Sequence, residues 1–152
     1  MQIYRIYIDK EGYTALGYGP AGARWNKAFT PVIYASSQVS LSMLEHLSIR
    51  GASVSKLNWK LATLELDVTP HFVNVTDLPG DWDFRPHPRS TQEIGSRWAL
   101  QRQSLALAVP SARLPLSRFP KEYNLLINPF HPEFLEKIRL VSEEDVPFQL
   151  NY

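Results

Sequence analysis

Short apolar runs that end in turn-forming residues recur along this chain and constrain its fold more than any other sequence feature. A run of about four to eight residues rich in Ile, Leu, Val and Tyr, closed by Pro, Gly, Asn or Asp, is typical of a β-strand. The run at 56–68 changes phase near Ala62 and Thr63, which predicts a β-bulge. We expect strands over 3–8, 31–36, 56–68, 104–109 and 123–128, and one or two more near the C-terminus.

Other segments have helical spacing. Between Ser37 and Gly51, leucines recur at helical intervals, with Ser37 as the predicted N-cap and Gly51 as the predicted stop. The stretch 80–95 is rich in Pro, Gly and charge, and predicts an exposed loop that leads into a short helix over 96–102. A helical turn is expected within 129–138. Strands therefore outnumber helices, and the sequence predicts a mixed α+β fold.

Length and composition favour one ordinary globular domain. The chain has 152 residues, of which 44% are hydrophobic and 20% charged, and a chain of this size builds a core without metals or cross-links. The absence of cysteine excludes disulfides, thiolate chemistry and cysteine-ligated zinc. The chain shows no charged leader followed by an apolar run, and no segment approaches the roughly 20 apolar residues that span a bilayer. We expect one domain over residues 1–152 in a cytoplasmic protein.

Several function classes lack their motifs. The four histidines show no HExxH or other paired spacing, so no metal is expected. The chain has no GxSxG elbow, and its glycine-rich segment 17–23 is not a phosphate loop. The formal net charge of +1 lacks the basic excess of non-specific nucleic-acid binders.

One segment still offers a nucleic-acid alternative. Its arginines and tryptophans could stack on a single strand, although a solvated loop and a helix anchored by its tryptophan is the more common structure. These residues are Trp82, Arg85, Arg89, Arg97, Trp98 and Arg102.

Three polar residues, Arg24, Tyr34 and Glu45, interrupt apolar segments in the first third of the chain. A surface arginine beside a tryptophan, and a core tyrosine with its hydroxyl at the edge, are ordinary features. Glu45 is more informative, because it borders the apolar stripe of its expected helix, next to Leu41 and Ile49. A carboxylate there is unfavourable unless it has a partner or opens into a cleft.

The polar residues of two further segments can be explained either by the requirements of a turn or by a role in a binding site. Ser111 follows Pro110 at the end of an apolar run, where its hydroxyl can cap a turn or hold a ligand. In "NPFHP", residues 128–132, an asparagine and two prolines end a strand. Asn128 and His131 are therefore interpreted as structural.

A family resemblance joins these separate features. Six segments resemble, in order, the RES domain, a family named for its characteristic Arg, Glu and Ser. The spacing of Arg24, Tyr34 and Glu45 fits the family pattern, and one departure is Phe29, where the family usually has glycine. The resemblance covers nearly the whole chain and rests on "ARWN" (23–26), "PVIYAS" (31–36), "SLSMLEHL" (40–47), "TQEIGSRW" (91–98), "VPSA" (109–112) and "YNLLINPFHPEF" (123–134).

The resemblance implies a fold and an activity. The fold would be similar to that of ADP-ribosyltransferase toxins, with a split, twisted sheet and flanking helices around an NAD-binding cleft. The activity would be that of the toxin in a RES-Xre type II toxin-antitoxin system. Such a toxin arrests growth by cleaving the nicotinamide–ribose bond of NAD, as an NAD glycohydrolase or an NAD phosphorylase. NAD is the expected substrate, inorganic phosphate a candidate co-substrate, and no metal is expected.

It also implies partners. We expect an Xre-like helix-turn-helix antitoxin that blocks the cleft, and neither direct nucleic-acid binding nor membrane binding. The formation of a homodimer is a further possibility that the sequence does not decide.

By the same resemblance, Arg24, Tyr34 and Glu45 are the expected catalytic residues, and Arg24, Tyr34 and Ser111 are expected to bind NAD. Glycosyl transfer passes through an oxocarbenium-like state, which a carboxylate such as Glu45 stabilises. A guanidinium suits phosphate or ribose oxygens, and an aromatic ring offers a flat face to nicotinamide. Ser111 is expected to donate hydrogen bonds or position phosphate, because no base is present to make it a nucleophile.

Two alternatives remain beside NAD cleavage. The first is transfer of ADP-ribose to a protein, because the same chemistry serves any nucleophile admitted to the ribose C1′. The second is a non-catalytic NAD-binding module, for which Phe29 is the best sequence support. A bulky residue at that position is expected to reshape its loop and to affect the width of the cleft.

Overall fold

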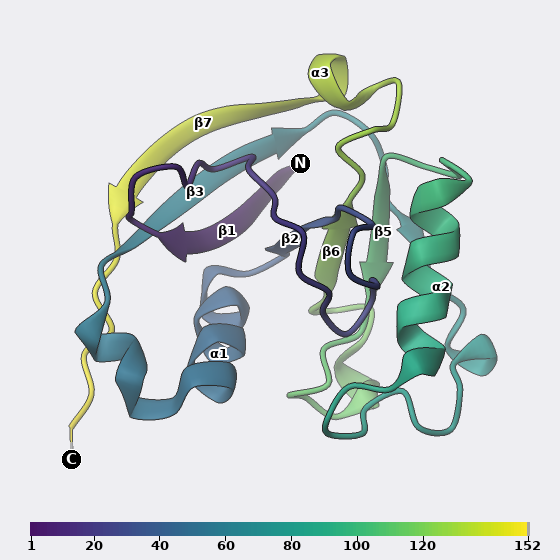
Figure 1. Ribbon diagram of the computed structural model, residues 1–152, viewed down its shortest axis with the longest axis horizontal. Coiled ribbons are helices and arrows are strands. Elements are labelled where there is room, and N and C mark those ends of the chain that lie inside the picture. Colours follow the sequence, from purple (N-terminus) through teal and green to yellow (C-terminus); the bar gives the residue numbers. More distant parts are fainter. Residues whose placement is uncertain (152) are drawn as a thin grey trace.

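In the computed structural model, which describes residues 1–151, seven strands form one twisted sheet in the order β4-β5-β6-β2-β1-β3-β7 (Figure 1). Neighbouring strands are antiparallel except for β4 and β5, which run parallel. The expected α+β class is confirmed. The strands are β1 (Gln2–Ile8), β2 (Ile33–Ser36), β3 (Trp59–Leu66), β4 (His71–Phe72), β5 (Ala106–Val109), β6 (Asn124–Ile127) and β7 (Ile138–Asp145).

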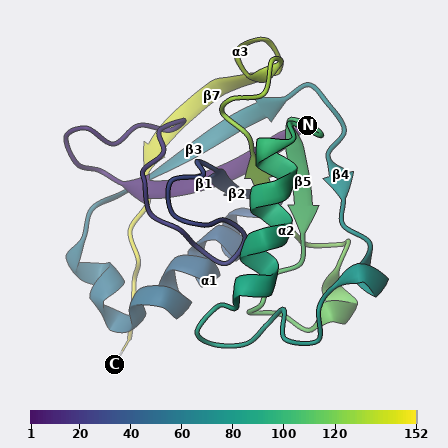
Figure 2. The same cartoon turned by 45° about the vertical axis from the view of Figure 1, so that its right-hand side comes forward.

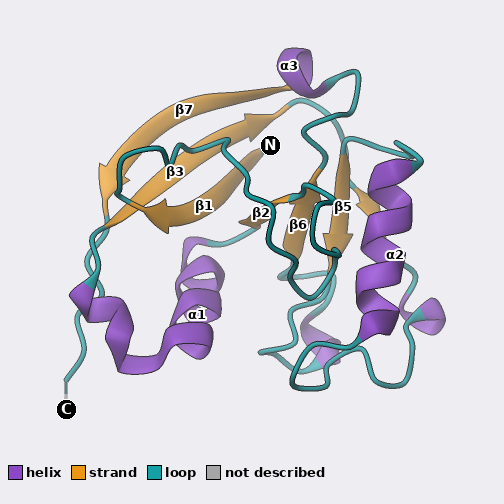
Figure 3. Ribbon diagram, viewed as in Figure 1, coloured by secondary structure: helices purple, strands orange, loops and turns teal. Residues whose placement is uncertain are grey.

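The helices are α1 (Val39–Arg50), α2 (Arg89–Leu100) and α3 (Phe134–Lys137). The two 12-residue helices, α1 and α2, lie on opposite sides of the β2, β6 and β5 strands in Figure 3. Short 3₁₀ helices complete the fold at Gly51–Lys56, Val75–Asp77 and Leu116–Arg118. None of the helices within residues 1–151 is both long enough and apolar enough to cross a membrane.

The sheet divides into two halves where β1 meets β2. These two strands pair at one position, Tyr4 opposite Ser36. By contrast, β1 pairs with β3 along its whole length, and β2 does the same with β6. Figure 1 shows the half made of β1, β3 and β7 turning away from the half made of β2, β6 and β5. The expected split sheet is confirmed.

The strands follow the apolar runs closely. The irregularity expected near Ala62 and Thr63 lies one step on, as a register shift between Thr63 and Leu64 in the pairing of β3 with β7. The expected strand over 56–68 is shorter, because the chain up to Lys56 forms a 3₁₀ helix. Strand β4 has only two residues, too few to give a periodic signal, and was not expected from the sequence.

Helix α1 begins later than expected. Gln38, and not Ser37, occupies the N-cap position. Ser37 instead continues the β2–β6 pairing, because its amide donates to the Tyr123 carbonyl at 2.9 Å and its hydroxyl accepts from the Tyr123 amide at 3.0 Å. The predicted stop at Gly51 is confirmed, since its φ of 58° is in the left-handed region that glycine favours.

Helix α2 was the least accurate expectation. It begins at Arg89, well before the expected start at residue 96, and it covers β5 with the loop that precedes β2 beside it (Figure 2). Gly95 lies inside this helix, where glycine normally lowers helix propensity. The reason is a close contact, because a Cβ at Gly95 would lie 1.7 Å from the Trp25 carbonyl oxygen.

The tryptophans of this region belong to the core. Trp82 and Trp98 are 8% and 3% exposed, and they pack in one cluster with Trp25 and Leu107. Rings buried in this way cannot stack on nucleotide bases. The nucleic-acid alternative therefore loses its aromatic support.

The close contact at Gly95 predicts an inverted effect of alanine. In an exposed helix interior, Gly→Ala stabilises by up to about 1 kcal/mol. Gly95→Ala should instead destabilise the protein by about 2 kcal/mol, because the added methyl group overlaps the Trp25 backbone. Urea unfolding measures the difference. Gly80→Ala is the control, since a Cβ there meets nothing within 4 Å, and a stabilising Gly95→Ala would contradict the packing.

Candidate active site

A cleft of about 440 Å³ lies beside β2, between helix α1 and the segment that follows β5. Arg24, Tyr34 and Glu45 all line it, so the fold brings the three expected catalytic residues together. They come from a loop, a strand and a helix. The wall also includes Ser36, His46, Arg113 and Asn124, for which sequence analysis predicted no role in the site.

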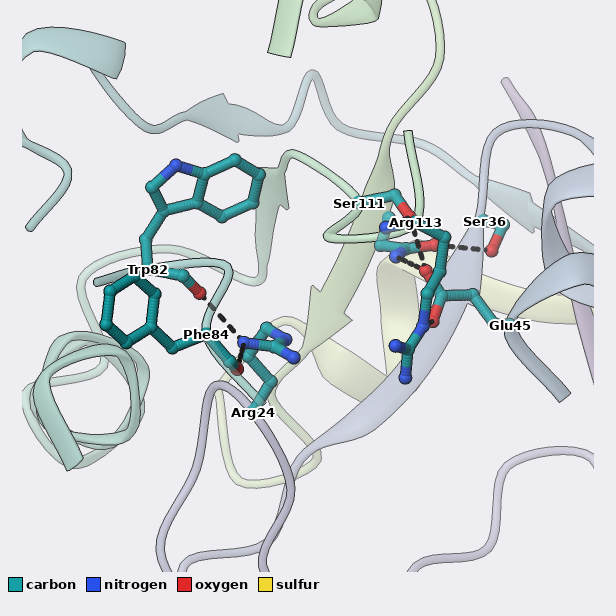
Figure 4. Close-up of polar contacts among 8 residues, drawn as sticks. Arg24, Ser36, Glu45, Trp82, Phe84, Ser111 and Arg113 are labelled. Carbon is teal, nitrogen blue, oxygen red and sulfur yellow. Dashed lines mark hydrogen bonds and ion pairs between the residues drawn. The ribbon is translucent and has the colours of Figure 1, made fainter. Parts of the chain in front are cut away.

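Glu45 is held through one of its two carboxylate oxygens. Its Oε1 accepts hydrogen bonds from Ser111 Oγ at 2.6 Å and from Asn124 Nδ2 at 2.8 Å (Figure 4). Ser36 Oγ donates to Asn124 Oδ1 at 2.8 Å, which orients the amide so that its NH₂ group faces the carboxylate. Among residues 1–151, the second oxygen, Oε2, has only an ion pair with Arg113 Nε at 3.7 Å. The carboxylate is thus fixed through Oε1, whereas Oε2 faces the Arg113 guanidinium.

Sheet register explains the Glu45 contacts. Ser36, the last residue of β2, pairs with Asn124, the first residue of β6. Helix α1 starts three positions after Ser36 and carries Glu45 back over this end of the strands. A one-residue slip in the register would turn the Asn124 side chain to the other face of the sheet.

Ser111 lies behind the cleft wall. It is 4% exposed and is absent from the lining residues. Its hydroxyl donates to Glu45 and accepts from the Arg113 amide at 3.0 Å. This geometry does not favour the phosphate contact expected for Ser111, because the hydroxyl is engaged within the protein. It orients Glu45 instead.

Arg24 is held by backbone carbonyls. Its Nη1 donates to the carbonyl oxygens of Trp82 at 2.8 Å and of Phe84 at 3.0 Å (Figure 4). Burial, and next the positive charge of Arg113, lower the pKa of the Arg24 guanidinium. The effect of Arg113 indicates that the two cations lie near each other in the cleft.

Helix α2 holds the backbone around Arg24. Thr91 Oγ1 donates to the Arg24 carbonyl at 2.6 Å, and Gln92 Nε2 donates to the Ala23 carbonyl at 3.0 Å. Ser96 Oγ accepts from the Lys27 amide at 2.9 Å. The "TQEIGSRW" segment therefore fixes the "ARWN" segment, which explains why both features occur in one fold.

Tyr34 uses its hydroxyl within the protein. The hydroxyl donates to Asn26 Oδ1 at 2.6 Å and accepts from the Trp25 amide at 3.2 Å. Burial raises the pKa of Tyr34, so the hydroxyl stays protonated. Its ring lines the cleft. The ring face, and not the hydroxyl, is available to a ligand.

His46 also lines the cleft but is tied to the core. Its Nε2 lies 2.9 Å from the Ile6 carbonyl oxygen, and its ring contacts Trp59 with the centroids 4.7 Å apart. A carbonyl oxygen only accepts, so the proton lies on Nε2. Burial lowers the pKa of His46, which keeps the ring neutral.

Phe29 does not line the cleft, and its side chain is 83% exposed. The expected effect on cleft width stays a prediction. Its φ of 67° is left-handed, which explains why glycine suits this position.

This chain is similar to one known protein family and to several named proteins. The family model described as the RES domain matches residues 2–151. A Yersinia enterocolitica protein named Toxin Res is 36% identical over 138 residues, which are 88% of each chain. A Photorhabdus laumondii protein of the same name is 31% identical over 151 residues, covering 95% of this chain and 92% of its own. A Sphingobium protein named Prs ADP-ribosylating toxin is 32% identical over 139 residues, covering 86% and 83%.

One solved structure has a similar fold. It is a chain of the crystal structure of the M. tuberculosis MbcT-MbcA toxin-antitoxin complex, with a TM-score of 0.71 and 17% sequence identity. The match covers 96% of this chain and 84% of that chain. At this identity the likeness concerns the fold alone, and it agrees with the α+β class.

The left-handed backbone at Phe29 predicts an unusual order of stability. Phe29→Gly should be more stable than Phe29→Ala by about 1 kcal/mol, because only alanine keeps the left-handed strain. At Phe130, also exposed but without a positive φ, the same pair should show the ordinary order, with alanine more stable. Urea midpoints measure both pairs. An alanine advantage at both positions would contradict the backbone conformation.

Proposed function

This chain belongs to the RES domain family, and we propose that it is the toxin of a toxin-antitoxin pair, cleaving the bond between nicotinamide and ribose in NAD. The names of the relatives support the toxin assignment, since two are called Toxin Res. The observation that carries the chemistry is the Glu45 carboxylate. One oxygen is saturated by Ser111 and Asn124, and the other faces a cleft that also contains Arg24.

The proposed reaction separates charge along one bond. The C1′–N bond breaks, nicotinamide leaves as a neutral molecule with the bonding electron pair, and the ribose becomes oxocarbenium-like. Glu45 Oε2 stabilises that positive charge, while Oε1 stays with Ser111 and Asn124. Arg24 binds the diphosphate, because its guanidinium is presented at the cleft by two carbonyl oxygens.

The acceptor defines the reaction type. Water yields ADP-ribose and a proton, which makes the enzyme an NAD glycohydrolase, whereas inorganic phosphate yields the 1″-phosphate of ADP-ribose, which makes it a phosphorylase.

Purified protein is incubated with NAD in phosphate-free buffer and again with phosphate, and free nicotinamide is measured. Release in either buffer supports the proposal, and the product identifies the acceptor. No release in both refutes it.

A second candidate function is transfer of ADP-ribose to a protein. One relative's name, Prs ADP-ribosylating toxin, favours it. Intact-mass analysis of cellular proteins after incubation with the enzyme and NAD separates the two candidates. A protein that gains the mass of ADP-ribose supports transfer, and full consumption of NAD with no labelled protein excludes it. The non-catalytic alternative rested on Phe29, whose exposed side chain does not line the cleft.

The proposed partner is an antitoxin that covers the cleft. The solved structure with a similar fold is titled a toxin-antitoxin complex, and an Xre-like helix-turn-helix protein remains the expected type. Co-expression with the neighbouring reading frame tests this. Growth arrest by the chain alone, rescue by the pair and a complex that releases no nicotinamide support it. Harmless expression of the active protein contradicts it.

Glu45→Gln should lower the rate of nicotinamide release by about a hundredfold or more. The change keeps the size of the side chain but removes the charge that stabilises the transition state. Glu93→Gln makes the same change on an exposed helix position and should leave the rate unchanged. Initial rates at saturating NAD give the comparison. Wild-type turnover by Glu45→Gln would remove Glu45 from the proposed mechanism.

Arg24→Lys should weaken NAD binding by about tenfold or more. One ammonium group cannot bind the carbonyls of Trp82 and Phe84 and also present a planar pair of donors to phosphate. The loss should appear mainly in KM, with Arg118→Lys on an exposed segment as the control. Normal KM and kcat for Arg24→Lys would return Arg24 to a structural role.

A further inference from the structure

Arg113 has an unusual environment for a buried cation. Its side chain is 13% exposed and lines the cleft. Its Nε is buried and donates no hydrogen bond to any atom of the residues that the structure describes. Glu45 Oε2 lies 3.7 Å away, beyond hydrogen-bonding distance. Buried donors are nearly always paired, so Arg113 Nε has hydrogen-bonding capacity to offer to a ligand that enters the cleft.

The two arginines of the cleft are held differently. Arg24 is fixed by hydrogen bonds to two carbonyl oxygens. The backbone of Arg113 is fixed, because its amide donates to Ser111 Oγ, but its guanidinium makes only the long ion pair with Glu45. Figure 4 shows Arg24 on one side and the Glu45–Arg113 pair on the other. Arg113 is therefore the cation that can follow a ligand.

The charges of the cleft favour an anion. Among the described residues, Glu45 is the one carboxylate that lines the cleft, which it shares with the guanidinium groups of Arg24 and Arg113. Burial, and next the positive charge of Arg113, lower the pKa of Arg24, which means that the two cations repel each other. An anion between them relieves that repulsion.

We propose that Arg113 couples recognition of phosphate to exposure of the Glu45 carboxylate. In the free protein its guanidinium covers Glu45 Oε2. A phosphate-bearing nucleotide draws the guanidinium away, because it offers Nε and the terminal nitrogens the hydrogen bonds that Glu45 does not supply. Oε2 is then free to face the ribose. This inference rests on the proposed function of the cleft, and it adds that Arg113 selects nucleotides over nucleosides.

Substrates that differ in phosphate content test the coupling. NAD carries a diphosphate, nicotinamide mononucleotide one phosphate and nicotinamide riboside none. Arg113→Gln should lower kcat/KM for NAD by about ten- to a hundredfold, the usual effect of losing charge-assisted hydrogen bonds. The value for the riboside should stay at the wild-type level or rise, because in the variant no guanidinium covers Glu45 Oε2. Arg113→Lys should recover part of the activity on NAD.

The controls separate selection from folding. Arg118→Gln removes the same charge from an exposed position in the same β5–β6 connection and should change none of the three substrates. Equal losses on NAD, the mononucleotide and the riboside would assign Arg113 a merely structural role and overturn the inference. Unchanged kcat/KM for NAD in Arg113→Gln would overturn it as well.

A binding measurement distinguishes this inference from the proposed function. Calorimetry with inorganic pyrophosphate requires no cleavage of NAD. Wild type and Arg118→Gln should bind it, and Arg113→Gln should bind at least about tenfold more weakly. If wild type releases no nicotinamide but binds pyrophosphate through Arg113, only the proposed function fails. Pyrophosphate binding that is absent, or indifferent to Arg113, refutes the inference whatever happens to NAD.

Discussion

A carboxylate in a half-buried cleft must be given hydrogen-bond donors, and the split of the sheet determines how this protein supplies them. Strand β2 meets β1 at a single position, Tyr4 opposite Ser36, and pairs along its whole length with β6, which sets Ser36 opposite Asn124. Helix α1 then lies over this end of the strands and brings Glu45 to the Asn124 amide.

The other wall of the cleft depends on contacts between distant parts of the chain. Helix α2 binds the backbone of the loop before β2 through three side-chain hydrogen bonds, and Gly95 lets the two backbones approach without a Cβ between them. The loop before α2 supplies the two carbonyls that hold the Arg24 guanidinium. The position of Arg24 is thus a property of the packed fold, and not of the "ARWN" segment.

Local signals in the sequence were sufficient for the strands other than β4, the bulge within a residue and the α1 stop at Gly51, whereas the convergence of Arg24, Tyr34 and Glu45 was expected only from the family resemblance. Signals that arise only from tertiary contact were not available. Gly95 resembles a helix breaker until its contact with Trp25 is known, so the start of α2 was placed too late. Asn124 reads as an ordinary strand residue until the register is known. For Arg113, the segment "PSARLP" (110–115) shows that a cation is present but not that its side chain lines the cleft.

Neutral groups hold the two charged residues that the resemblance identified. Hydroxyl and amide donors hold Glu45, and backbone carbonyls hold Arg24. Within the described residues, Glu45 and Arg24 form no ion pair with each other, although both line one cleft. A direct ion pair between them would satisfy both charges in the free protein and leave little interaction for a substrate. Positioning by neutral dipoles keeps the Arg24 charge available for the proposed anionic nucleotide, and on Glu45 it leaves Oε2 with the 3.7 Å ion pair to Arg113, which the proposed cationic transition state would replace.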